Sequence, residues 1–462
     1  MTNSWWLDQA LSGEAAAAAD DAPPVDGESR ADVCVVGGGY AGLWTALTLK
    51  QRAPTLDVAV VERDVCGSGA SGRNGGFALT MWHHIGSLTG ICGVDDALWI
   101  GRASEDAVDE IGRFCTAHEI DADYRRHGWL WTATNASQVG AWSSTERALE
   151  RHGITPFQEL DRRAAQHRSG SPWPHAATYE ATAATLQPAK LARGLRRVAL
   201  EHGVRIHEHS PMVALERSRT PAVRTPQGRI TADRVVLCMN AWTAGVRRMD
   251  RAFAIVGSDV VVTEPAPAEL DRLGVEPGLA VSDSRMMVHY HHRTADDRIA
   301  FGKGGLGLAY GTHADSDTTP ERSAKVAGRL ATAYPALADL PIAGRWAGPI
   351  DRTVDGLPFF TTLGRPDILC GAGFSGNGVG PAVLGGRILA SLVLDADDDW
   401  ARCGLVRRPP SGIPPEPLRS LGGRLVQAAV ARKEHAEDAG RRPRRAAQWV
   451  AGLAPTGLTP RD

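Results

Sequence analysis

The chain has 462 residues, of which 43% are hydrophobic and 23% are charged, and its formal net charge is −2. This length favours two or three domains in an ordinary globular protein, and the balanced charge argues against nucleic acid or a membrane as a partner. The seven cysteines form no CxxC pair, which fits a reducing compartment better than a disulfide framework. The basic run at 441–445 is expected to be a solvated tail.

Residues 1–30 are predicted to be a loosely ordered lead-in, because DDAPPVDGES has the composition of a linker. The alanine run at 15–19 lacks a basic start and is flanked by acids, so we do not interpret it as a signal peptide. No stretch approaches the roughly 20 apolar residues that a membrane-spanning helix needs. We therefore predict a cytoplasmic protein.

The next segment predicts a βαβ unit. Residues 32–36 form a short apolar strand, residues 40–53 have helical periodicity, and residues 57–62 form a second buried strand. A strand, a glycine turn, a helix and a strand within about 30 residues indicate a parallel sheet.

The turn of this unit reads GGGYAG and predicts a dinucleotide site. Gly37 permits the tight turn, Gly39 lets the backbone approach a pyrophosphate, and Gly42 permits close packing of the helix on the sheet. The helix N-terminus presents N–H groups to the phosphates, and Glu62 ends the next strand, where it can accept hydrogen bonds from ribose hydroxyls. An acid at position 62 argues against a 2′-phosphate on the ligand.

Further along, a glycine-rich loop (CGSGASGRNGGF) precedes an amphipathic helix at 95–118 and a strand at 128–134. A helix begins at Pro188, strand-like runs follow at 234–241 and between 250 and 310, and a helix is predicted at 320–333. The strand DILCGAG then leads into a helix at about 381–394. The α/β segments therefore bracket a β-rich middle, which predicts a nucleotide-binding domain assembled from separated segments, with a second domain inserted.

At this point the motifs resemble a known family. GGGYAG, ER, GASGRNGG, TLQPAKLARGL, RVVLCMNAW, WAGPIDRTVDGLPFF and GFSGNGVGP, taken in order, are similar to the D-amino-acid-oxidase-like FAD-dependent amine oxidases. These include glycine oxidase, sarcosine oxidase and γ-glutamylputrescine oxidase, and the resemblance spans about 31–394. The opening SWWLDQAL and the segment from EPLRSLGG onward resemble the subgroup described as γ-glutamylputrescine or aminophosphonate oxidases.

The resemblance implies an α/β protein with an α+β substrate part. A Rossmann-like FAD-binding domain would be built from residues 31–90, 155–250 and 343–395. An inserted antiparallel β-sheet domain, at 91–154 and 251–342, would bind the substrate. Residues 396–462 would form a C-terminal helix and tail.

The resemblance also implies which residues bind FAD. The GFSGNG segment would cover the flavin ring, with the helix N-terminus facing its pyrimidine carbonyl, and Val213 would bracket the adenine through its backbone. Asn74 stands where histidine-linked relatives carry His, so the FAD is expected to be non-covalent. The predicted cofactor-binding residues are Gly37, Gly39, Tyr40, Ala41, Gly42, Glu62, Arg63, Gly69, Ala70, Ser71, Arg73, Asn74, Gly75, Gly76, Val213, Asn240, Ala241, Trp242, Gly373, Phe374, Ser375, Gly376, Asn377, Gly378 and Val379.

The chemistry that the resemblance implies is oxidation of a C–N bond. An unprotonated amine delivers hydride to the flavin, the imine hydrolyses, and O2 reoxidises the flavin to give H2O2. Ile350 and Gly376 stand where glycine-oxidase-like sequences carry arginines for the substrate carboxylate, and Gly380 stands where sarcosine-oxidase-like sequences carry lysine. These departures disfavour small amino acids and favour a larger amine such as a polyamine derivative.

Four residues are candidates for the substrate side of the reaction. Tyr290 and His289 in MMVHYHH could line the cavity, Arg352 could replace the missing cation, and Lys303 could promote the reaction with oxygen. His289 and His291 share one face of the expected strand, but no third ligand lies near them, so no metal site is predicted.

Three alternatives remain open from the sequence. The protein could be an FAD-dependent dehydrogenase with an acceptor other than oxygen, or an FAD-stabilised binding protein without catalysis. It could also be an NAD-dependent enzyme, although such an enzyme would not need the GASGRNGG and GFSGNGVGP loops.

Overall fold

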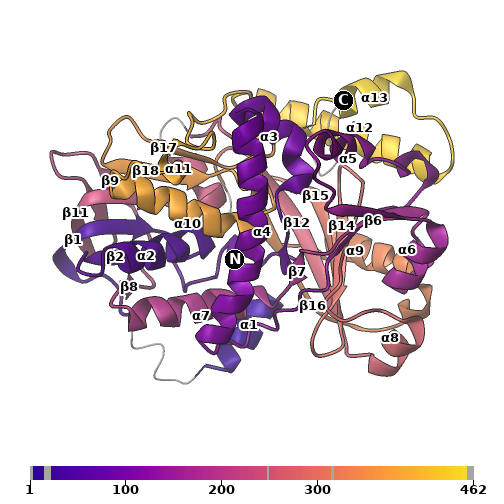
Figure 1. Ribbon diagram of the computed structural model, residues 1–462, viewed down its shortest axis with the longest axis horizontal. Coiled ribbons are helices and arrows are strands. Elements are labelled where there is room, and N and C mark those ends of the chain that lie inside the picture. Colours follow the sequence, from indigo (N-terminus) through magenta and orange to yellow (C-terminus); the bar gives the residue numbers. More distant parts are fainter. Residues whose placement is uncertain (1–3, 15–21, 247–248, 314–316, 455–462) are drawn as a thin grey trace.

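The computed structural model describes residues 4–14, 22–246, 249–313 and 317–454. Two large sheets lie side by side, and helix α4 (Val94–Ala117) runs between them in the view of Figure 1. Helices α12 (Leu418–Asp438) and α13 (Arg445–Ala451) lie along the top of that view. No helix of the described residues is long and apolar enough to cross a membrane.

The first sheet has the strand order β17-β18-β11-β1-β2-β8. Neighbours in this order pair in parallel except β17 and β18, and the short strands β9 (Ala214–Glu216) and β10 (Ala222–Arg224) extend β11 by antiparallel pairing. Helices α2 (Tyr40–Arg52), α7 (Pro188–Glu201) and α10 (Val379–Val393) pack on one face. The central strands are buried on both faces, as a parallel sheet requires. The predicted Rossmann-like fold is confirmed. The strands are β1 (Gly27–Val36), β2 (Val58–Val61), β8 (Arg205–His207), β11 (Gly228–Leu237), β17 (Phe359–Thr362) and β18 (Ile368–Ala372).

The second sheet has the order β16-β12-β15-β14-β13-β4-β6-β5 and is antiparallel apart from the β13–β4 pair. Helix α9 (Pro320–Ala333) covers part of one face through Val326 and Leu330, which pack on Phe301. Its opposite face turns towards the first sheet. The strands are β4 (Trp129–Ala133), β5 (Phe157–Leu160), β6 (Ala176–Glu180), β12 (Ala254–Thr263), β13 (Ala280–Asp283), β14 (His289–Arg293), β15 (Ile299–Leu308) and β16 (Ile342–Arg352).

Capping side chains and prolines explain where two of the predicted helices begin. The Gln187 side chain accepts a hydrogen bond from the Lys190 amide and Pro188 occupies the first turn of α7. Thr319 caps α9 in the same way, again ahead of a proline. Helix α10 begins at Val379, two residues before the expected Pro381, because a proline is tolerated within the first helical turn.

Two segments pair in a different sheet from the one that the predicted domain boundaries imply. Residues 157–180 and 343–352 fall within the predicted FAD-binding domain, but β5, β6 and β16 hydrogen-bond within the second sheet. Strand β6 pairs with β4, and β16 pairs with β12 along its whole length. Partner choice between strands far apart in the chain leaves no local pattern, so the boundaries could not be read from periodicity.

The N-terminal segment also differs from its prediction, because part of it is helical. Residues Trp5–Ser12 form helix α1, which Ser4 caps by accepting a hydrogen bond from the Leu7 amide. Trp6 is 1% exposed, and its indole Nε1 donates to the Asn74 carbonyl oxygen at 3.1 Å. The prediction of a loose segment is therefore wrong for this helix, while residues 1–3 and 15–21 lie outside the described part.

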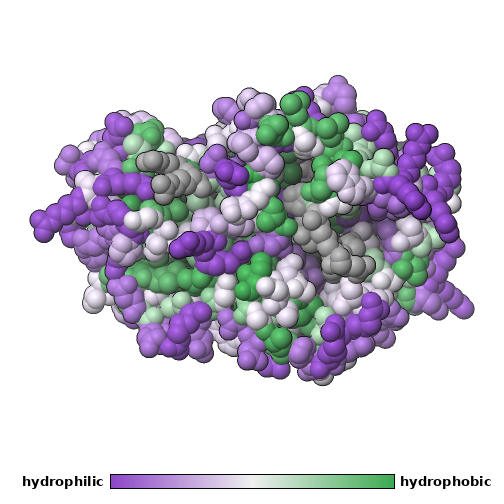
Figure 2. All heavy atoms as spheres, turned by 90° about the horizontal axis from the view of Figure 1, so that it is seen from above, coloured by the Kyte–Doolittle hydropathy of each residue, from purple (hydrophilic) through white to green (hydrophobic). Residues whose placement is uncertain are grey.

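The surface seen in Figure 2 carries hydrophobic patches between hydrophilic side chains. Helices α12 and α13 lie on this side of the molecule, and they carry the exposed side chains Leu421, Leu425 and Trp449.

We expect Trp6→Ala to lower the free energy of unfolding by about 3 kcal/mol or more, because a buried indole and its hydrogen bond are lost. The glycine loop that Trp6 supports should also hold FAD less tightly. Urea unfolding followed by flavin absorbance measures both effects. Trp449→Ala is the control, since Trp449 is 71% exposed and its loss should change stability by about 0.5 kcal/mol or less. Equal effects of the two variants would contradict the role of α1.

Candidate active site

A cavity of about 1160 Å³ lies between the two sheets. The glycine turn after β1 and the loop at 68–75 border it on one side, and strands β14, β15 and β16 border it on the other. The segment 374–379 and helix α12 complete its lining. The cavity is larger than the roughly 300–1,000 Å³ typical of one small-molecule site, so it has room for a dinucleotide together with a substrate.

The glycine turn is shaped by contacts that allow no side chain. A Cβ atom added at Gly42 would lie 1.9 Å from the Gly37 carbonyl oxygen, and one at Gly37 would lie 2.4 Å from the Cys238 oxygen. Gly37 also has a φ of +112°, which favours glycine. Helix α2 starts after Gly39 without a side-chain cap, and its N-terminus borders the cavity, as a diphosphate would require.

Glu62 borders the cavity at the end of β2. Its Oε2 accepts a hydrogen bond from the Gly38 amide at 2.7 Å, and Oε1 accepts one from the Asp64 amide at 3.0 Å. Burial raises the pKa of this carboxyl group. Each carboxylate oxygen has two lone pairs, so acceptor capacity remains for the hydroxyl groups of a ribose. Nearby, the Arg63 guanidinium lies 4.7 Å from the centre of the Trp242 ring.

In the loop at 68–76, polar side chains hold the backbone in shape. Arg73 Nε donates to the Ser68 oxygen at 2.8 Å, and its Nη1 donates to the Ala347 oxygen at 3.1 Å. Asn74 Oδ1 accepts a bond from the Gly76 amide at 2.8 Å. Arg73 and Asn74 are among the residues predicted to bind the cofactor. Both residues border the cavity, and these contacts connect the loop to itself and to β16.

Asp351 fixes the segment that the resemblance places over the flavin. This fully buried carboxylate accepts hydrogen bonds from the amides of Gly373 at 2.5 Å and Ser375 at 3.3 Å. Burial raises its pKa to about 6. Gly378, the residue before α10, provides no side-chain cap. Gly378 and Val379 both border the cavity, so the N-terminus of α10 lies at the cavity wall. Asp351 itself was not predicted, because its role depends on a contact between the two sheets.

Most of the predicted cofactor residues border the cavity. Gly42, Gly76, Ala241 and Gly373 do not. The three glycines among them permit close contacts behind the lining, and Ala241 is buried. Val213 borders the cavity, but its amide donates to the Arg224 carbonyl oxygen at 2.8 Å, so that N–H is already used within the protein.

On the substrate side, Tyr290, Ile350 and Arg352 line the cavity. The Tyr290 hydroxyl lies 2.8 Å from Ser258 Oγ, and burial raises the pKa of the phenol to about 12, so it stays neutral. Ile350 Cδ1 lies 3.4 Å from the position that a Cβ of Gly376 would occupy. The two positions at which relatives carry arginines are therefore adjacent in space, as the resemblance implies.

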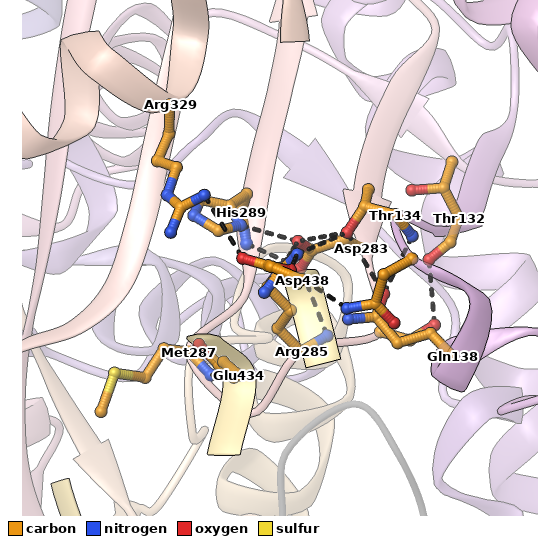
Figure 3. A network of polar contacts seen from close by, with 12 residues as sticks. Thr132, Thr134, Gln138, Asp283, Arg285, Met287, His289, Arg329, Glu434 and Asp438 are labelled. Carbon is orange, nitrogen blue, oxygen red and sulfur yellow. Dashed lines mark hydrogen bonds and ion pairs between the residues drawn. The ribbon is translucent and has the colours of Figure 1, made fainter. Parts of the chain in front are cut away.

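His289 and Lys303 do not border this cavity, unlike the arrangement expected from the sequence. The alternation of β14 and β15 turns both side chains to the opposite face of the sheet, where Lys303 Nζ lies 3.0 Å from His289 Nε2. His289 Nδ1 lies 2.6 Å from Asp283 Oδ2 (Figure 3), and burial lowers the histidine pKa to about 4. Among the described residues, no group of three His, Cys, Asp or Glu side chains could hold a metal ion.

The motifs and the cavity define an FAD-dependent oxidoreductase, and a family comparison supports this conclusion. The family model DAO, "FAD dependent oxidoreductase", matches residues 32–392. The chain belongs to this family. The predicted family, cofactor and enzyme class are confirmed, and both the NAD-dependent and the non-catalytic alternatives are disfavoured.

The chain is similar to several known proteins. Gamma-glutamylputrescine oxidoreductase of Escherichia coli (strain K12) is 31% identical over 365 residues, which cover 78% of this chain and 83% of that protein. Glycine oxidase of Pseudomonas putida is 24% identical and covers 79% of this chain and 95% of its own. The solved structure of glycine oxidase from Geobacillus kaustophilus shares the fold, with a TM-score of 0.68 at 22% identity over 82% of this chain and 99% of that one.

Gly42→Ala should weaken FAD binding by about tenfold or more, which corresponds to about 1.4 kcal/mol. The added methyl group would collide with the Gly37 carbonyl oxygen and push α2 away from β1. The flavin absorbance per chain after purification and the Kd of the apoprotein for FAD measure this. Gly90→Ala is the matched control, because a Cβ there meets no atom within 4 Å. Full FAD occupancy in Gly42→Ala would refute the role assigned to this glycine.

The raised pKa of Asp351 predicts that the free energy of unfolding depends on pH. Its folded-state pKa of about 6 lies above its ordinary value of 3.8, so the folded chain holds this proton more tightly than the unfolded chain. The contribution of Asp351 to stability is therefore complete below pH 3.8 and is lost as the pH rises through about 6. The free energy of unfolding should fall more steeply over this range in the natural protein than in Asp351→Asn. Urea unfolding at a series of pH values tests this, and parallel curves would contradict it.

Proposed function

We propose that the protein oxidises the C–N bond of a primary or secondary amine larger than glycine or sarcosine, with non-covalent FAD as hydride acceptor and O2 as final oxidant. The observation that carries the proposal is that Ile350 and Gly376 lie side by side in the cavity wall and neither carries a charge. A pair of arginines there would bind a substrate carboxylate, and each such charged hydrogen bond contributes roughly 1.5–3 kcal/mol.

Bound FAD would supply the chemistry, a two-electron oxidation of the carbon beside the amine nitrogen with reduction of O2 to H2O2. The protein's own contribution is binding and orientation. The uncapped N-terminus of α10 borders the cavity, where its partial positive charge stabilises negative charge on a ligand. The neutral phenol of Tyr290 and the hydroxyl of Ser258 provide uncharged polar groups beside the apolar wall.

The residues that line the substrate side of the cavity indicate which class of amine it binds. Ile350 and Gly376 offer no charge to a carboxylate next to the reacting carbon, which favours an amine whose reacting end carries none. Similarity to gamma-glutamylputrescine oxidoreductase supports a polyamine derivative or a related amine. Arg352 lies on the same face of β16 as Ile350, two residues further along, and could accept an anionic group elsewhere on such a substrate.

The decisive test is anaerobic reduction of the bound flavin, followed by absorbance, with polyamines, γ-glutamyl-polyamines, N-methyl amino acids and aminophosphonates. We expect a larger amine to reduce the flavin faster than glycine or sarcosine. Equal rates with glycine or sarcosine would overturn the inference from the absent arginines. Admission of air with H2O2 detection then separates an oxidase from a dehydrogenase, which would reoxidise slowly with oxygen alone.

Ile350→Arg provides a matched gain-of-function variant. A guanidinium at this position should improve the kcat/KM for sarcosine relative to the best larger amine by about tenfold, the equivalent of one charged hydrogen bond. Ile350→Met, which has similar volume and no charge, is the control and should leave the ratio unchanged.

A further inference from the structure

Helix α12 closes the cavity, although it lies beyond the residues that match the family. The family match ends at residue 392, and α12 begins at Leu418. Gly422, Gly423 and Val426 nevertheless line the same cavity as Tyr290. The cavity therefore has a wall for which the family comparison provides no role.

The first half of α12 is held against the second sheet. At its start, Arg419 donates to the carbonyl oxygens of Asp250 at 2.6 Å and Gly311 at 2.9 Å. In its middle, Gln427 Nε2 donates to the Gly305 oxygen at 2.5 Å. These bonds are partly buried, and the Gln427 bond ties α12 directly to β15, to which Gly305 belongs.

The end of α12 is held by a buried polar network, shown in Figure 3. Asp438 Oδ1 accepts bonds from Arg285 Nη2 at 2.5 Å and Asn135 Nδ2 at 3.1 Å, and Arg285 Nε pairs with Asp283 at 3.0 Å. Glu434 Oε1 accepts a bond from the Met287 amide at 3.1 Å. Removing one member would leave a buried charge unpaired, which is costly.

This network also holds the turn between β13 and β14. Lys303 Nζ donates to the Met287 carbonyl oxygen at 3.1 Å, so the peptide groups on both sides of Met287 are bonded to the network. Met286 and Met287 line the cavity and pack on Val430 and Ala429 of α12. His289 and Lys303 thus act on the cavity through its wall and not by contact with its contents.

Two adjacent glycines mark where α12 crosses the cavity. A Cβ at Gly423 would lie 2.5 Å from Leu308 Cδ2, so Gly423 permits close packing on β15. A Cβ at Gly422 would meet no atom within 4 Å, and Gly422 borders the cavity. A side chain at 422 would therefore occupy cavity space and not displace protein. The lining contributed by α12, β15 and the residues just after α13 includes the apolar side chains Leu308, Val426, Val430 and Leu453, together with the polar Arg419 and Gln427, whose side chains bond to backbone oxygens.

We propose that α12 is the far wall of the amine site and that Gly422 determines how long a carbon chain the site accepts. Glu434 and Asp438 are positioning residues that hold this wall and the Met286–Met287 turn together. The preferred substrate is then an amine with an extended methylene chain along the apolar wall. This inference rests on the proposed function for the reacting end of the substrate.

The test is Gly422→Phe, assayed with unbranched primary amines of increasing length by anaerobic flavin reduction. A phenylalanine that displaces two methylene groups, each worth about 0.8 kcal/mol when buried, should weaken the longest amines by about tenfold relative to the shortest. Gly328→Phe is the matched control, because Gly328 is an exposed helical glycine of α9 with open space around it. A uniform loss at every chain length, or the same change in Gly328→Phe, would overturn the proposal.

Binding is measured separately from turnover. Unbranched alcohols of the same lengths have no C–N bond to oxidise, and their Kd follows from perturbation of the flavin absorbance. If no amine reduces the flavin, the proposed function fails, while a length-dependent Kd that Gly422→Phe abolishes would still support the wall. If alcohol binding shows no dependence on length in the natural protein, the inference about Gly422 fails by itself.

The positioning residues have their own test. Glu434→Gln keeps an acceptor for the Met287 amide, whereas Glu434→Ala does not. We expect Glu434→Ala to raise the KM of the longest amines more than that of the shortest, with kcat less affected, and Glu434→Gln to restore most of the difference. A fall in kcat alone at every length, or no rescue by glutamine, would show that Glu434 does not position the wall.

Discussion

One buried carboxylate joins the two halves of the site. Asp351 belongs to β16 of the second sheet, and it accepts hydrogen bonds from Gly373 and Ser375 in the loop after β18 of the first sheet. Because the carboxylate is fully buried, each of these bonds is made without competition from water. The loop is therefore held at a fixed distance from β16, with Ile350 beside Gly376 and the N-terminus of α10 directed into the cavity.

The other contacts around the cavity extend the same arrangement. Arg73 connects the glycine loop to β16 through the Ala347 oxygen, and Trp6 of α1 supports that loop from outside. Strand β16 thus contacts both glycine-rich segments that enclose the expected flavin site. On the far side, the network around Asp283, Glu434 and Asp438 fixes α12 against the second sheet (Figure 3). The cavity is therefore bounded by elements from both sheets and by the C-terminal helix α12.

The local part of the site was predictable from the sequence. Gly37, Gly39, Gly42 and Glu62 have roles that depend on a single strand–turn–helix–strand unit, and such units leave a recognisable spacing. The alternation of β14 was also predictable, since it follows from strand geometry that Tyr290 and His289 face opposite ways. Which of the two faces borders the cavity was not, because it depends on the packing of one sheet against another.

The sequence by itself determined the dinucleotide turn and the glycine-rich cap before α10, because each depends on residues close together in the chain. It also determined that positions 350 and 376 carry no arginine, because that is a matter of residue identity alone. Only the tertiary structure decided that α12 lines the cavity, that α1 supports the glycine loop from outside, and that Lys303 lies in a network behind the cavity wall. It also decided that β5, β6 and β16 pair in the second sheet. Contacts between segments hundreds of residues apart depend on how whole layers pack, and no local spacing or periodicity records that packing.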